Sequence, residues 1–77
     1  MNTSLNEVVV HINEVLDDAR FEDLERGIRQ DPGVVAVGRQ PAHDHLMVVV
    51  YDSAVARASG ILHNFHERGL HAQLVGM

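Results

Sequence analysis

The sequence contains no cysteine, and that absence excludes several kinds of chemistry. Disulfide frameworks, thiol redox catalysis and cysteine-based zinc sites all need a thiol. Basic residues are scarce as well: 6 Lys and Arg stand against 11 Asp and Glu, which gives a net charge of -5. A protein that binds nucleic acid presents a basic surface to the phosphates, so this composition argues against nucleic acid as a partner.

Long apolar segments are also missing. The longest apolar run falls far short of the roughly 20 residues that a membrane span needs, and Met1–Ser4 do not begin a secretory signal pattern. We therefore expect a soluble, cytoplasmic protein with no membrane partner. The length of 77 residues fits one small domain over residues 1–77. A domain of this size buries only about 60% of its unfolded surface, so we expect modest stability or support from self-association.

Hydrophobic periodicity alternates between the patterns of strands and helices. Val8, Val10 and Ile12 recur at strand spacing, and Asp31–Gly33 provide a stop and a tight turn after the first helical pattern. The expected elements are a strand around 8–12, a helix from Asp17 to about residue 30, a strand over 34–37, a hairpin connection over 39–45, a strand over 46–51, a helix from about Ser53 to Arg68 and a strand over 70–74. This order predicts an α+β ferredoxin-like βαββαβ sandwich, a four-stranded antiparallel sheet with two helices on one face.

Several landmarks resemble, in order and spacing, the heavy-metal-associated domain of small copper chaperones and P-type ATPase tails. They are Asp31–Val37, Val48–Asp52, Ile61, Phe65 and Gly69–Val75, and the resemblance covers about residues 7 to 76. It implies the same ferredoxin-like fold.

That family carries its metal on a Met-x-Cys-x-x-Cys loop after the first strand, and the resemblance places this loop at residues 15–20. Asp17 and Arg20 stand at the cysteine positions, and Leu70 replaces the Tyr or Phe that the family tends to place before the last strand. Cu(I) favours sulfur ligands. We therefore expect a degenerate member whose loop does not bind Cu(I) with chaperone-like affinity, a prediction that competition against a strong Cu(I) chelator tests.

Histidines are the remaining transition-metal ligands, and the chain has six. His43 and His45 lie on the expected hairpin, either as part of a solvated turn or as a loose metal pair. His11 and His71 lie on the first and last strands, which are neighbours in this fold. They are either exposed sheet residues or a pair that binds a metal or titrates at an interface. His63 and His66 are expected on the solvated face of the second helix.

Three carboxylates surround the loop position, and two interpretations account for them. Glu14, Asp17 and Asp18 offer the oxygen ligands that hard cations prefer. Helix capping explains Asp17 and Asp18 without a metal, and Arg20 opposes a bound cation.

Enzymatic patterns are lacking. The serines have no nucleophile-elbow context, and no glycine-rich phosphate loop precedes a helix. We expect no catalytic activity. The one cofactor that the residues of this chain could bind is a divalent transition metal.

The third expected strand departs from the usual alternation. Leu46–Val50 is apolar on both faces, and Val9 with either Val34 or Val35 adds to the side that the helices leave bare. This predicts an apolar patch of several hundred Å², a scale typical of interaction sites. The alternative is a sheet that merely tolerates β-branched residues because they favour strands. The expected interface residues are Val9, His11, Val35, Val48, Val50 and His71.

Two functions remain open. One is an interaction module without a thiolate metal site that binds a second copy or a protein partner through its sheet. The other is a divergent carrier or sensor of Zn, Ni, Cu(II) or Co that uses histidine and carboxylate ligands.

Overall fold

The computed structural model describes residues 4–40, 43 and 45–75. The elements follow the order β1 (Leu5–Ile12), α1 (Asp18–Arg29), β2 (Val34–Arg39), β3 (Leu46–Asp52), α2 (Ala58–Glu67) and β4 (Ala72–Val75). The sheet has four strands in the order β2-β3-β1-β4, and all neighbouring strands are antiparallel. This confirms the predicted ferredoxin-like α+β fold.

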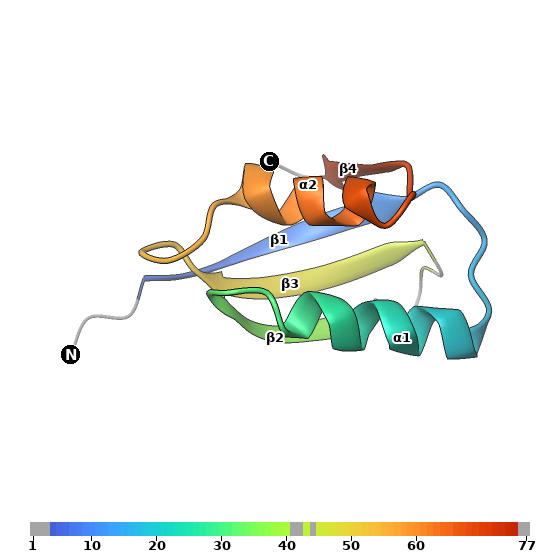
Figure 1. Cartoon of the computed structure of the whole chain (residues 1–77), viewed down its shortest axis with the longest axis horizontal. Helices are drawn as coiled ribbons and strands as arrows, with labels where there is room; N and C mark the ends of the chain where they lie inside the picture. Colours follow the sequence, from blue (N-terminus) through green and yellow to red (C-terminus); the bar gives the residue numbers. More distant parts are fainter. Residues whose placement is uncertain (1–3, 41–42, 44, 76–77) are drawn as a thin grey trace.

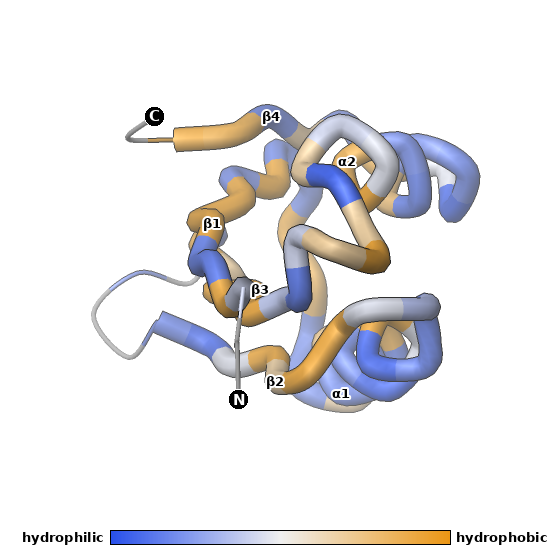
Figure 2. Tube along the Cα trace, turned by 90° about the vertical axis from the view of Figure 1, so that its left-hand side faces the viewer, coloured by the Kyte–Doolittle hydropathy of each residue, from blue (hydrophilic) through white to orange (hydrophobic). Residues whose placement is uncertain are grey.

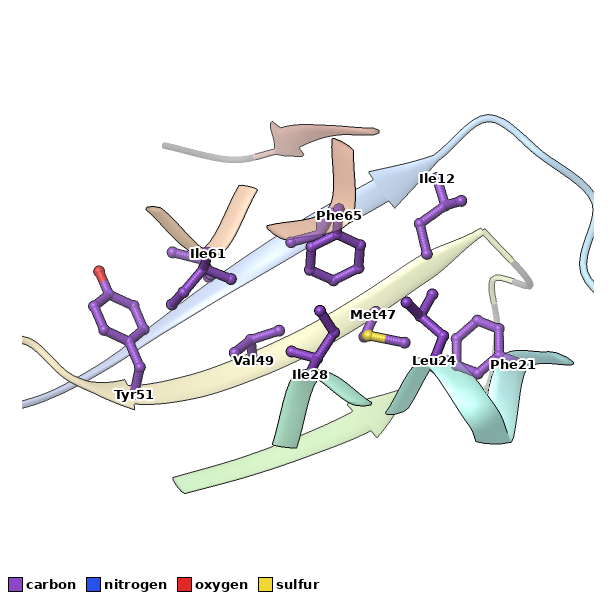
Figure 3. Close-up of a cluster of buried hydrophobic side chains, with 11 residues drawn as sticks. Ile12, Phe21, Leu24, Ile28, Met47, Val49, Tyr51, Ile61 and Phe65 are labelled. Carbon is purple, nitrogen blue, oxygen red and sulfur yellow. The ribbon is translucent and has the colours of Figure 1, made fainter. Parts of the chain in front are cut away.

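The two helices lie side by side on one face of the sheet (Figures 1 and 2). α1 packs near β2 and α2 packs near β4, so together they cover the sheet from one edge to the other. Figure 3 shows the core that fills the space between the layers. Its buried side chains are Val8, Val10, Ile12, Phe21, Leu24, Ile28, Met47, Val49, Tyr51, Ile61 and Phe65.

Local signals fix the ends of the elements. The Asp17 side chain accepts a hydrogen bond from the Arg20 backbone N–H at 2.8 Å, so Asp17 is the N-cap of α1, as the capping interpretation predicted. Gly33 has φ of 87° and Gly69 has φ of 80°, a left-handed backbone that glycine adopts without strain. The turn before β2 and the end of α2 therefore lie where the sequence predicts them.

The second helix begins later than predicted, at Ala58 and not near Ser53. The Asp52 carboxylate accepts from the Ala54 N–H at 2.9 Å, and the Asp52 carbonyl accepts from Val55 and Ala56. These bonds close a tight turn that competes with helix formation.

The last strand also begins later than predicted, at Ala72 and not at Leu70. The His71 N–H donates to the Glu14 side chain and not to a backbone carbonyl of a neighbouring strand.

Within the described residues, no helix is long and apolar enough to cross a membrane. The predicted hairpin connection over 39–45 lies partly outside the described residues, since 41, 42 and 44 are not described.

Candidate functional site

The sheet has one face that neither described helix covers, on the left in Figure 2. Its centre is formed by the two middle strands, where Val9 of β1 is the direct partner of Val48 of β3. Val75 lies opposite Val9 on β4, and Gly38 lies opposite Val48 on β2. These pairs place an apolar row across the whole width of the sheet. We call the exposed apolar side of the sheet the open-face patch; it comprises Val9, Leu46, Val48, Val50 and Val75.

Alternating burial along β3 shows which side chains belong to the open-face patch. Met47 and Val49 are fully buried on the helix side, whereas Val48 and Val50 are half-buried and point the other way. Both valines therefore face away from the helices, as the double-sided apolar pattern of this strand predicts.

The second strand resolves the open alternative between Val34 and Val35. Val34 packs against the core, whereas Val35 is 55% exposed and lies where the register between β2 and β3 shifts. A register shift of this kind bends an edge strand locally. Val35 therefore lies at the margin of the sheet and not in its centre.

Polar residues surround the open-face patch. Glu7 is the partner of Val50, and Gln73 is the partner of His11. Asp52 lies opposite Leu5 at one end of the sheet. An apolar centre with a polar rim is the usual composition of a protein interface.

At the end of the sheet where β1 finishes and β3 begins, two histidines form a pair that differs from both expected pairs. The rings of His11 and His45 stack with their centroids 5.8 Å apart and an angle of 23° between their planes. The His45 Nδ1 lies 2.8 Å from the carbonyl oxygen of Ile12. The structure thus brings His11 against His45, a pairing that the sequence does not predict. His43 is exposed, and its backbone N–H donates to the Gln40 carbonyl.

His71, the residue before β4, contacts the carboxylate of Glu14. Its Nδ1 lies 2.6 Å from Glu14 Oε2, and its backbone N–H donates to both carboxylate oxygens at 2.9 and 3.1 Å. These hydrogen bonds from the His71 side chain and backbone hold the pKa of Glu14 below its ordinary value of 4.5, because they stabilise the ionised carboxylate. The His71 side chain is 81% exposed, so its contact with Glu14 is a surface contact.

The loop that the family resemblance assigned to metal binding lies between β1 and α1 and has other partners. Asp17 caps α1, and Asp18 forms an ion pair with Arg39 at 2.9 Å. The Arg39 guanidinium in turn lies 4.2 Å from the centre of the Phe21 ring. In the described part of the chain, no group of three or more His, Asp or Glu side chains is arranged to hold a metal ion.

The two histidines of α2 are exposed, as predicted. His63 Nε2 lies 3.5 Å from a Glu67 oxygen, and His66 Nε2 contacts the Ala72 carbonyl oxygen at 2.9 Å. Because a carbonyl only accepts, His66 donates this bond and thereby ties α2 to β4.

No protein-family model and no curated protein matches this sequence. Function is therefore inferred from the uncovered sheet face and from the pair of His11 and His45.

Sequence reasoning missed two contacts, the stack of His11 on His45 and the bond between His71 and Glu14. Each depends on register: His11 lies opposite Leu46, which brings the preceding residue, His45, beside it. Hydrophobic alternation identifies which residues share a face, but it does not state which residues of two strands lie opposite each other. No local signal in the sequence identifies either pair.

Proposed function

We propose that this protein is an interaction module that forms a two-fold dimer through the open-face patch. It would be a degenerate relative of heavy-metal-associated domains, with the fold put to use in association and no thiolate metal site. The observation that carries the proposal is the continuous apolar row across the sheet, on the face that neither described helix covers. Exposed apolar surface of this kind on a small domain marks an interaction site.

The dimensions of the molecule favour a second copy as the occupant. The molecule measures 39 × 25 × 21 Å. Helices and sheet are stacked along its shortest axis (Figure 2), so the uncovered sheet face is one of its broad sides. A standard protein interface takes about 800 Å² from each partner, which is about one sixth of the 4979 Å² surface of this chain. A broad side of the molecule can supply that area.

The distribution of charge favours the same occupant. Two copies with a net charge of -5 each repel one another unless their charged groups stay away from the contact. Of the carboxylates on this face, Asp52 lies opposite Leu5 at one end of the sheet, and Glu7 lies opposite Val50 where β1 has no described β4 partner. A two-fold axis lets one apolar patch bury itself against an identical patch while these carboxylates stay in solvent.

The test is sedimentation velocity of the wild type, Val48→Asp and Val15→Asp at about pH 7.5. The wild type is expected to be a dimer. Val48→Asp is expected to be a folded monomer, because the dimer would bury an unpaired carboxylate at the centre of the contact. Val15→Asp is the matched control, since Val15 is 84% exposed and belongs to the loop before α1. It should remain dimeric.

A wild type that stays monomeric at high concentration contradicts the self-association proposal and leaves a different protein partner for the patch. A shift of equal size in Val15→Asp shows that added charge, not the position of the charge, weakens the dimer.

A transition-metal carrier or sensor is the second candidate function. The observation that favours it is the contact between His11 and His45, which brings two imidazoles together within one chain.

A further inference from the structure

We propose that His11 and His45 form a binding site for one divalent transition-metal ion, with preference for Cu(II) over Ni(II) and Zn(II). Both residues belong to the same chain and lie at the end of the sheet where β1 finishes and β3 begins. The site is therefore independent of the proposed dimer. Imidazole nitrogen is the ligand type that these ions accept in the absence of thiolates.

A hydrogen bond fixes the tautomer of His45 in the form that a metal ligand needs. Its Nδ1 contacts the Ile12 carbonyl oxygen at 2.8 Å, and a carbonyl can only accept a hydrogen bond. Nδ1 therefore carries the proton, and in the neutral ring Nε2 carries the free lone pair. Histidine ligands in metalloproteins are held in the same way, by a hydrogen bond from the second ring nitrogen to a carbonyl or carboxylate.

His11 supplies the second imidazole. The ring is half-buried, and its Nδ1 is buried with no hydrogen-bond partner among the described residues. A buried polar atom of this kind requires an explanation, since most are paired. No hydrogen bond at Nδ1 fixes the tautomer of His11, and a rotation of the ring toward His45 is needed to bring one of its nitrogens to a metal ion.

The stacked geometry indicates an open site of moderate affinity. Two metal–nitrogen bonds of about 2.0–2.1 Å place the ligating nitrogens within about 4 Å of each other. The ring centroids are 5.8 Å apart, so a rotation of the side chains has to bring the nitrogens together. The described residues provide no group of three or more ligands, so the pair leaves coordination positions open to water. With imidazole and water as ligands, affinity follows the general order in which Cu(II) exceeds both Ni(II) and Zn(II).

The other histidine pair of the chain provides a matched control. His63 and His66 lie on the exposed side of α2, and the Nε2 of His66 already donates to the Ala72 carbonyl. Replacing both removes as many imidazoles as replacing His11 and His45, but it leaves the proposed site intact.

The experiment is calorimetric titration of tag-free protein with Cu(II), Ni(II) and Zn(II) salts at about pH 7.5. The variant His11→Gln/His45→Gln should lose at least about tenfold in metal affinity. Loss of a group that only orients a metal ligand already costs about tenfold or more, and loss of the ligand itself should cost no less. His63→Gln/His66→Gln should bind as the wild type does. The wild type should also lose binding below about pH 6, where imidazoles protonate.

Two further measurements test the proposal even if the His11→Gln/His45→Gln variant does not fold. Imidazole nitrogen signals of the wild type, followed by NMR during titration with Zn(II), should move first for His11 and His45. Movement of other histidines in their place overturns the proposal even if the double variant fails to fold. The monomeric Val48→Asp variant should bind as the wild type does; loss of binding there places the metal between two chains and overturns a site within one.

Discussion

The two sides of strand β3 have almost the same chemistry and opposite surroundings. Met47 and Val49 are fully buried beneath the helices (Figure 3). Val48 and Val50 are half-buried on the uncovered side. A strand with apolar residues on both faces is typical of a sheet that is covered on both sides. One side of this sheet is thus covered by the helices of the same chain, and the other side has an apolar surface that no described element covers.

The largest expected effect comes from placing the same charge on the two sides of β3. Val49→Asp should unfold the protein, because it buries a carboxylate without a partner in the core. A domain of 77 residues has a total stability of about 4–12 kcal/mol, and an unpaired buried charge removes much of it. Val48→Asp should keep a cooperative thermal transition. Circular dichroism melting of the two variants gives the answer, and unfolding in both would mean that the two faces do not differ as described.

A smaller effect concerns the helix that covers half of the sheet. Asp17→Ala removes the N-cap of α1 and should lower the free energy of unfolding by about 1 kcal/mol, within a range of roughly 0.5–2. Asp18→Ala is the control: its ion pair with Arg39 is largely exposed, and such pairs contribute about 0–1 kcal/mol. Urea denaturation measures both.

The Asp17→Ala variant also tests whether association depends on the uncovered face of the sheet or on the helix layer. Its change lies on the helix side, so the sedimentation behaviour of the folded variant should match the wild type. A dimer that dissociates in Asp17→Ala would show that association depends on the helix layer and not on the open-face patch.

The smallest effect is the pH dependence that comes from Glu14. Its folded-state pKa lies below 4.5, because His71 donates hydrogen bonds to the ionised carboxylate. The stabilisation is therefore present above the unfolded-state pKa and is lost as the pH falls through the folded-state pKa. Between about pH 5 and pH 3, the wild type should lose more stability than Glu14→Gln, which has no proton to take up at this position.

Urea denaturation of both proteins at the two pH values measures this difference. An identical acid dependence in wild type and Glu14→Gln would show that the contact with His71 does not persist in solution. The exposed position of His71 is the reason to expect only a slight difference.

Much of the fold follows from patterns within short segments. The Asp17 cap, the Gly33 turn and the apolar spacing of the helices and strands are local properties, and the structure has them where the sequence predicts them. The structure departs from these predictions in two places. The Asp52 side chain and carbonyl close a turn where the sequence predicts the start of a helix, and the last strand begins at Ala72 and not at Leu70.

The pair of His11 and His45 was predictable only in part. The sequence identifies His11 and His45 as candidate metal ligands, but it pairs each of them with a different histidine. The structure brings His45 to the Ile12 carbonyl across 33 positions of the chain. Such a contact depends on how two strands are aligned, and a shift of register would place a different residue beside His11.

The order of the elements, the Asp17 cap, the Gly33 turn and the absence of a thiolate site all follow from the sequence, because each depends on residue type and short-range spacing. Which side of the sheet the helices cover and which histidines meet depend on tertiary packing. Val48 and Val49 are identical residues at adjacent positions, and their different environments come from the packing of distant segments against one side of the same strand.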